Sequence, residues 1–208
     1  MTTTTTLSFV HRFEPAALPG RPPLLLLHGT GGNEDDLLPV GRAVAPGAAL
    51  LSPRGQVLER GMPRFFRRLA EGVFDEPDLV RRTHDLADFV AQARDAYGLA
   101  APVAVGFSNG ANIAAAMLLL RPEVLAGAVL FRAMTPFAEE TTPARAPGPV
   151  LLVSGATDPI VPAPNAARLA ARLTRAGAAV DHETLPAGHG LSQHDLALAR
   201  NWLGQLPG

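Results

Sequence analysis

The sequence predicts an α/β protein with a mainly parallel sheet covered by helices on both faces, and three observations support this fold class. Short apolar runs alternate along the chain with stretches in which apolar residues recur at helical spacing. The runs are uniformly hydrophobic, as expected of parallel strands that are buried on both faces. Several runs lead directly into glycine-rich or polar loops, and in such sheets ligands bind among the loops at the carboxyl ends of the strands.

The N-terminal part of the chain is expected to contain three strands and one long helix. An edge strand is predicted over residues 6–12, which are rich in strand formers and are followed by several prolines. Leu24–Leu27 is a continuous apolar run, and residues 48–52 form the next expected strand. An apolar stripe at helical spacing predicts a helix over residues 78–97, which Gly98 ends.

The C-terminal part continues the alternation of strands and helices. Strands are predicted over residues 103–105, 125–131, 150–153 and 179–185. One helix is predicted to follow the first of these strands and to end at Leu120, before a proline, and another covers residues 165–176, before Gly177. Ser192, with Asp195 three residues later, is expected to cap a closing helix.

A long connection over residues 53–77 separates the third strand from the long helix. Connections of this length are usually functional or disordered, and the phenylalanines in this one argue against disorder. We interpret it as a cover over the mouth of a site. The alternative, in which the phenylalanines fill the core beneath a surface loop, fits the sequence equally well. The candidate residues of a substrate pocket are Met62, Phe65, Phe66 and Phe74 from this segment, together with Arg132 and Met134.

Size and composition limit the possible functions. A chain of 208 residues is expected to form one domain over residues 1–208, and its formal net charge of −1 provides no field to steer it toward nucleic acid or anionic membrane. The absence of cysteine excludes disulfides and thiolate catalysis, and the histidines and carboxylates lack compact metal-ligand spacing. We therefore expect no cofactor, no metal, no nucleic acid and no membrane partner. The N-terminus lacks the features of a signal peptide, so the cytoplasm is the expected location.

The segment Gly106-Phe107-Ser108-Asn109-Gly110 matches the Gly-x-Ser-x-Gly pattern and stands between an expected strand and an expected helix. Glycines two residues before and two residues after the serine permit a strained turn in which larger side chains would clash. The N-terminus of the following helix would point toward Ser108, where its dipole favours developing negative charge. This arrangement indicates acyl transfer with Ser108 as the nucleophile.

A serine hydroxyl is a poor nucleophile near neutral pH, so it needs an imidazole to take its proton and an acceptor to orient that imidazole. Ser108, Asp158 and His189 each follow an expected strand, so their loops can meet at one edge of the sheet. Their order along the chain is that of the α/β-hydrolase fold. Asp181 and Glu183 are weaker candidates for the acid.

The other histidines are weaker candidates for the base. His11 and His84 are expected far from the proposed edge, His182 falls within a strand, and His194 falls in the first turn of the closing helix. His28 lies closer, in a glycine-rich loop, where a structural hydrogen bond is the expected role.

The loop that follows Leu27 reads His28-Gly29-Thr30-Gly31-Gly32-Asn33. It could cradle a phosphate, but it lacks both the Lys-Ser/Thr pair of a P-loop and the Gly-x-Gly-x-x-Gly spacing. The favoured alternative is that the backbone N–H of Thr30 joins that of Asn109 to form an oxyanion hole.

At these motifs the sequence resembles the phospholipase/carboxylesterase family of α/β hydrolases, which includes the acyl-protein thioesterases. The matching segments are residues 27–32, 106–111, 155–162 and 188–190. Residues 64–75 are similar to a bacterial branch of small carboxylesterases associated with hydroquinone-type compounds. The resemblance implies that Ser108 is the nucleophile, His189 the base, Asp158 its orienting acid, and Thr30 and Asn109 the oxyanion donors. That branch often has His-Pro-Met where this chain has Arg132-Ala133-Met134.

The expected function is that of a cofactor-independent serine carboxylesterase that hydrolyses small esters through an acyl-enzyme, as a monomer or a homodimer. The chain is too short for a large inserted lid domain, which favours short acyl groups. A thioesterase or a lysophospholipase would use the same chemistry. A hydrolase fold that only binds a small ligand is the alternative from a different class.

Overall fold

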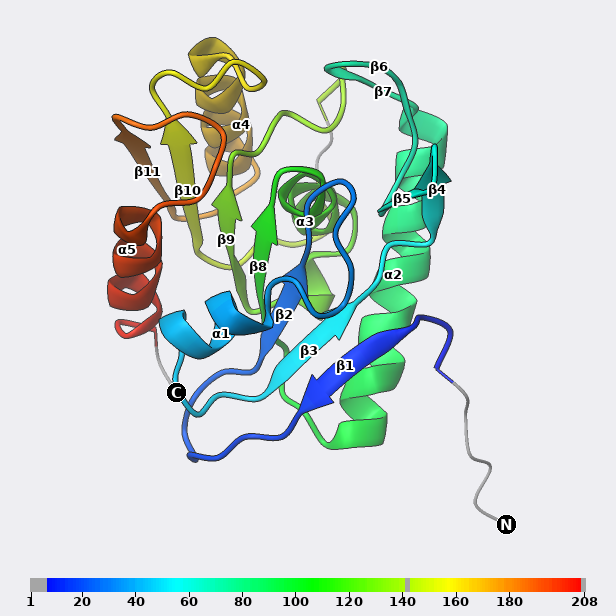
Figure 1. The fold of residues 1–208 in the computed structure, drawn as a ribbon, viewed down its shortest axis with the longest axis vertical. Helices are drawn as coiled ribbons and strands as arrows, with labels where there is room; N and C mark the ends of the chain where they lie inside the picture. Colours follow the sequence, from blue (N-terminus) through cyan, green and yellow to red (C-terminus); the bar gives the residue numbers. More distant parts are fainter. Residues whose placement is uncertain (1–6, 141–142, 207–208) are drawn as a thin grey trace.

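The computed structural model describes residues 7–140 and 143–206, and its main feature is a seven-stranded sheet (Figure 1). The strands lie in the order β1-β3-β2-β8-β9-β10-β11, and all neighbouring pairs are parallel except β1 with β3. They are β1 (His11–Glu14), β2 (Leu24–Leu27), β3 (Leu50–Pro53), β8 (Val103–Phe107), β9 (Gly127–Phe131), β10 (Val150–Gly155) and β11 (Val180–Leu185). The predicted mainly parallel sheet is confirmed.

Helices cover both faces of the sheet, as predicted. They are α1 (Leu38–Val44), α2 (Glu76–Tyr97), α3 (Asn109–Leu120), α4 (Ala163–Arg175) and α5 (Gln193–Leu203), with a short 3-10 helix, η1, at Pro122–Val124. Leu25 and Leu27 of β2 belong to the core formed with α2, α3 and α4, whereas Leu24 and Leu26 belong to the core formed with α1 and α5. Within the described residues, none of the helices is both long enough and apolar enough to cross a membrane.

Helix α1 has no counterpart among the predicted elements. It is seven residues long and contains both a proline and a glycine, which are poor helix formers. Its buried residues Leu38, Gly41 and Val44 nevertheless recur at helical spacing. A Cβ on Gly41 would lie 2.9 Å from Leu26 Cδ1 and 3.0 Å from Leu50 Cδ2, so the helix packs closely on β2 and β3. Tertiary packing, rather than intrinsic propensity, holds this helix in place.

Several predicted boundaries are shifted by one or more residues, among them those of the first strand and of helix α2. The first strand covers His11–Glu14 rather than residues 6–12, of which residue 6 lies outside the described part of the chain. Helix α2 begins at Glu76, two residues before the predicted start. The reason is that the Asp75 side chain accepts a hydrogen bond from the Asp78 N–H at 3.1 Å and so caps the helix earlier.

Two β-hairpins occupy the segment that the sequence predicted only as a connection. They pair β4 (Val57–Glu59) with β5 (Met62–Arg64), and β6 (Arg68–Ala70) with β7 (Val73–Phe74). Arg60 and Gly61, with φ of 51° and 80°, form the two-residue turn of the first hairpin. Both residues have left-handed backbone conformations, and the backbone twist of such a turn matches the twist of the flanking strands. Figure 1 shows the second hairpin beyond the ends toward which the arrows of β8, β9 and β10 point.

Candidate active site

Ser108 occupies the turn between β8 and α3 in a strained backbone conformation, with φ of 52° and ψ of −114°. Two backbone hydrogen bonds hold this conformation. The Ser108 N–H donates to the Phe131 carbonyl on β9, and the Asn112 N–H donates to the Ser108 carbonyl, both at 2.9 Å. A Cβ on Gly106 would lie only 2.7 Å from the carbonyl oxygen of Gly110, so the first glycine of the pattern is required by the close approach of the backbone.

Gly110→Ala is expected to destabilise the protein, because a Cβ there would lie 2.0 Å from the Leu27 carbonyl oxygen and 2.6 Å from that of His28. Overpacking against backbone costs roughly 1–3 kcal/mol or more. Thermal unfolding followed by circular dichroism should show a Tm that is lower by several degrees. The matched control is Gly190→Ala, where a Cβ would have no neighbour within 4 Å among the described residues. Equal Tm values for the two variants would contradict this account of the turn.

Ser108, His189 and Asp158 lie in the loops after β8, β11 and β10, and the structure brings their side chains together. The Nε2 atom of His189 is 3.0 Å from the Ser108 Oγ, and the Nδ1 atom is 2.8 Å from the Asp158 Oδ2. Because a carboxylate can only accept, Nδ1 carries the proton and Nε2 is free to accept from the serine hydroxyl. The Asp158 side chain is fully buried and that of His189 is 19% exposed, so only the serine end of this chain of hydrogen bonds is open to a substrate.

The environment of Asp158 keeps its side chain ionised. Burial by itself would raise the pKa of Asp158, but the N–H of Val161, the imidazole of His189 and the N–H of Ile160 outweigh it and hold the pKa below its usual value. The two N–H groups donate to Oδ1 at 3.0 and 2.8 Å, so Oδ2 is left for the imidazole. A carboxylate in this position can orient His189 and stabilise its protonated form.

Thr30 follows β2 and Asn109 begins α3, so the two predicted oxyanion donors flank the serine from different elements. Among the described residues, neither of their backbone N–H groups donates to a backbone carbonyl. Their side chains are held by the segment after β4: Arg64 Nη1 donates to Thr30 Oγ1 at 2.7 Å, and the Phe65 N–H donates to Asn109 Oδ1 at 2.8 Å. The first hairpin and the residue that follows it therefore position both residues.

His28 has the structural role that the sequence predicted. The N–H of Gly55 donates to its Nε2 at 3.0 Å, so Nδ1 carries the proton and donates to the Gly29 carbonyl at 2.6 Å. The ring also packs 4.7 Å from that of Phe65. Burial lowers the pKa of His28, which favours the neutral ring that these two hydrogen bonds require.

A cavity of about 30 Å³ lies beside Ser108, and Phe74 and Met134 line it as predicted. Arg68, Glu71 and Asn112 also line it, and the sequence reasoning missed them. Asn112 could have been found, because it lies about one helical turn after Ser108 and therefore on the same side of α3. Arg68 and Glu71 are brought to the site by a hairpin too short to leave a periodic signal.

The assignment of Met62, Phe65 and Phe66 to the pocket is wrong, because none of them lines the cavity beside Ser108. Phe65 and Phe66 are 2% and 0% exposed and belong to the core, so the alternative interpretation holds for these two residues. Burial in the core removes the whole ring from water, which a site open to solvent cannot do. Met62 is 40% exposed on β5 and packs near Gly31.

Arg132 lines the cavity as predicted, but its guanidinium is engaged by other residues of the protein. The side chain is 0% exposed and forms a two-pronged ion pair with Asp195 at 2.8 and 3.1 Å. It also donates to the carbonyls of Gly188 at 2.9 Å and Gly190 at 3.2 Å. Arg132 therefore binds the residues on both sides of His189 and fixes the loop that contains the imidazole.

The remaining candidates for the catalytic base and acid either bond to residues outside the site or are exposed. His11 bonds to the Tyr97 hydroxyl, His182 bonds to the Ser154 hydroxyl, and Asp181 accepts from the Trp202 indole. His84, His194 and Glu183 are exposed. Within residues 7–140 and 143–206, no group of three or more histidine, cysteine, aspartate or glutamate side chains could hold a metal ion.

The chain is similar to known hydrolases along most of its length. A family model of the alpha/beta hydrolase fold matches residues 22–148. The protein MhqD of Bacillus subtilis (strain 168) is 48% identical over 181 residues, which cover 86% of this chain and 90% of that protein. The crystal structure of the Bacillus cereus carboxylesterase aligns with a TM-score of 0.91 and 42% identity, over 95% of this chain and 94% of that one. A carboxylesterase from Mesorhizobium loti aligns with a TM-score of 0.89 and 33% identity, over 97% of each chain. The chain belongs to the α/β hydrolase family, in the group of carboxylesterases that its motifs resemble.

Proposed function

We propose that this hydrolase is a serine carboxylesterase, and the hydrogen-bonded chain from Ser108 through His189 to Asp158 carries the proposal. His189 Nε2 takes the hydroxyl proton as the Ser108 oxygen attacks the carbonyl carbon of the ester. The imidazolium, stabilised by Asp158, then protonates the leaving alcohol. Water attacks the acyl-serine, His189 accepts its proton, and the acid leaves as the serine is restored.

The backbone N–H groups of Thr30 and Asn109 are the proposed donors to the tetrahedral oxyanion. A donor of this kind contributes roughly 2.7–4 kcal/mol to transition-state stabilisation, so two of them supply a large part of the rate enhancement. Asn109 is also the first residue of the twelve-residue helix α3, whose N-terminal dipole favours negative charge at this point.

Short acyl esters are the proposed substrates, because the space directly beside Ser108 is only about 30 Å³ and the charged residues Arg64 and Arg68 border it. The resemblance to proteins named as carboxylesterases favours oxygen esters. A thioesterase or a lysophospholipase would use the same three side chains. A hydrolase fold that binds a small molecule without turnover is the alternative from another class.

A substrate panel tests this assignment. We expect kcat/KM for p-nitrophenyl acetate and butyrate to exceed that for p-nitrophenyl decanoate at least tenfold, because a long uncharged chain would have to leave the small space beside Ser108 past the charged side chains of Arg64 and Arg68. Acetyl and butyryl thioesters serve as the comparison at matched acyl length. A tenfold preference for the thioesters would assign a thioesterase instead. Labelling by a fluorophosphonate without turnover of any member of the panel would indicate a ligand-binding protein.

A further inference from the structure

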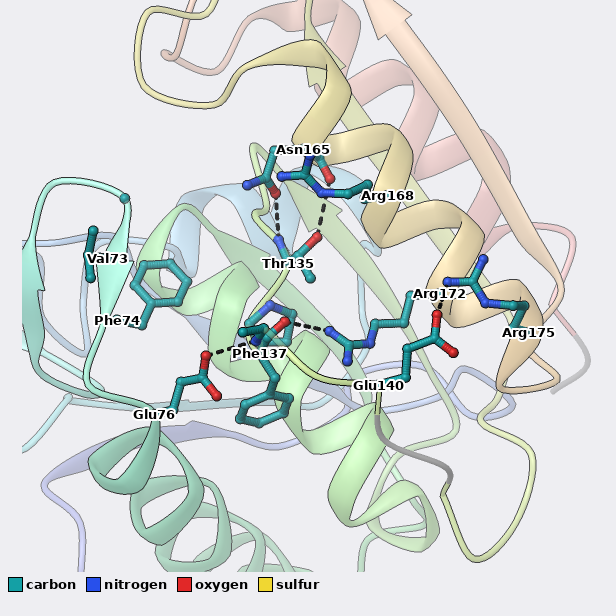
Figure 2. A pocket seen from close by; sticks show the side chains of 13 residues that line it. Val73, Phe74, Glu76, Thr135, Phe137, Glu140, Asn165, Arg168, Arg172 and Arg175 are labelled. Carbon is teal, nitrogen blue, oxygen red and sulfur yellow. Dashed lines mark hydrogen bonds and ion pairs between the residues drawn. The ribbon is translucent and has the colours of Figure 1, made fainter.

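A second cavity, of about 450 Å³, adjoins the one beside Ser108. Gly72 and Phe74 line both cavities, and Thr135 of the larger cavity directly follows Met134 of the smaller. Figure 2 shows the larger cavity between the hairpin that contains Phe74 and helix α4. A substrate whose ester group lies at Ser108 can therefore extend past Phe74 into this space.

The side of the cavity formed by α4 is rich in arginine. Arg168, Arg172 and Arg175 follow one another at intervals of four and three residues, so they lie on one face of the helix (Figure 2). Two carboxylates also line the cavity, but both are engaged. Glu140 pairs with Arg175, and Glu76 accepts a hydrogen bond from a backbone N–H at 2.8 Å. Among the described residues, Arg168 and Arg172 form no ion pair with a carboxylate.

Arg172 is the most unusual of these groups, because it is a cation that is only 5% exposed. Its Nη1 donates to the Phe137 carbonyl at 2.5 Å, whereas its Nε and Nη2 have no hydrogen-bond partner in the part of the chain that the structure describes. Burial lowers the pKa of Arg172, as expected where the charged form is poorly solvated. Buried charges in proteins are normally paired, but among the described residues Arg172 has no carboxylate within ion-pair distance, although Glu140 and Glu76 act on it through space.

The opposite side of the cavity is apolar. Val73 and Phe74 of the second hairpin form this side (Figure 2). Pro136 and Phe137 also line the cavity, although the Phe137 ring is only 6% exposed and belongs to the core. Pockets with apolar walls and a few convergent polar groups bind small organic molecules and orient them by those groups. This combination fits an aliphatic chain that ends in a carboxylate.

We propose that the larger cavity binds a free carboxylate carried by the ester substrate, so that the preferred substrates are monoesters of dicarboxylic acids. Arg168, which is exposed, donates N–H groups to the carboxylate directly. Arg172 attracts the carboxylate mainly through its charge, because its unpaired nitrogens are shielded from solvent. Burial also means that this charge is only weakly screened. This inference rests on the proposed esterase function and adds a substrate class to it.

The kinetic test compares monomethyl adipate with methyl hexanoate, which have the same chain length and differ in the free carboxylate. Proton release in a pH-stat should show a kcat/KM at least tenfold higher for the adipate monoester. Arg168→Gln and Arg172→Met should each lower that value at least fivefold and leave the value for methyl hexanoate within twofold. Arg200→Gln, an exposed arginine on α5 across the sheet, is the matched control and should change neither value. Equal values for the two esters in the wild-type protein, or a preference that both variants retain, would overturn the proposal.

A binding measurement separates this proposal from the esterase assignment. Isothermal titration of adipate into the wild-type protein should give a Kd that increases at least fivefold in Arg168→Gln and in Arg172→Met, but not in Arg200→Gln. Adipate binding with this pattern but without turnover of either ester would keep the carboxylate site and refute the esterase. No adipate binding to the wild-type protein, together with no preference between the esters, would refute the carboxylate site alone.

Discussion

Ser108→Ala is expected to keep the fold and to reduce kcat/KM for p-nitrophenyl butyrate about 10⁴-fold or more. The side chain of Ser108 bonds only to His189 among the described residues, and the backbone hydrogen bonds that hold the turn are unaffected by the change. Alanine removes the attacking oxygen, so the acyl-enzyme route is lost while the oxyanion donors and the cavity remain. The small residual rate should come from these remaining features.

The matched control is Ser154→Ala, which deletes a serine hydroxyl on β10 that bonds to His182 rather than to His189. This variant should keep kcat/KM within threefold of the wild-type value. Thermal unfolding of both variants shows whether a change in rate reflects a change in stability. A fluorophosphonate should label the wild-type protein and Ser154→Ala but not Ser108→Ala. If Ser108→Ala turned over the ester at the wild-type rate, Ser108 would have no part in the mechanism.

Arg132→Met is expected to produce the second large effect, on both stability and turnover. Removing one partner of a buried ion pair leaves the other charge uncompensated, here that of Asp195, at a cost of about 3–5 kcal/mol. For a chain of about 200 residues this corresponds to a Tm lower by roughly 6–20 °C. The carbonyls of Gly188 and Gly190 also lose their donor, so the loop that holds His189 becomes less ordered. We therefore expect kcat to fall at least tenfold with KM nearly unchanged.

The double variant Arg132→Met, Asp195→Asn separates the two effects of this change. Asparagine keeps an acceptor for the N–H of Ser192 but removes the uncompensated charge, so part of the lost Tm should return. The low kcat should persist, because the carbonyls beside His189 still lack their donor. Arg12→Met, which removes one partner of the exposed pair with Asp35, is the matched control and should lower the Tm far less than Arg132→Met, because solvent screens an exposed pair. Recovery of both Tm and kcat in the double variant would show that Arg132 only stabilises the fold.

The elements with strong local signals were predictable from the sequence. The four leucines of β2 form a continuous apolar run because they alternate between two cores. The closing helix begins where Ser192 and Asp195 predict a cap, since the capping box needs only residues three apart. Helix α1 and the two hairpins were not predicted, because seven-residue and two- or three-residue elements contain too little periodicity to be distinguished from loops.

The convergence of Ser108, Asp158 and His189 could be anticipated for a topological reason. Each residue follows an apolar strand, and the carboxyl ends of parallel strands share one edge of a sheet. The positions of Phe65 and Phe66 could not be anticipated in the same way. Their apolar rings suit either a pocket wall or a core, and only the paths of the two flanking hairpins place them in the core.

The residues proposed for acyl transfer could be chosen from local patterns, because a serine in a strained turn requires glycine on both sides and its partners must follow strands. The surroundings of Arg132 and Arg172 became known only from the folded chain. The partners of the Arg132 guanidinium lie 21 to 63 residues away along the chain, and whether a guanidinium is paired depends on what the fold packs around it. The Arg132 guanidinium is paired with Asp195 and with three backbone carbonyls, whereas the buried Arg172 forms no ion pair with any described residue. No local pattern distinguishes the two arginines.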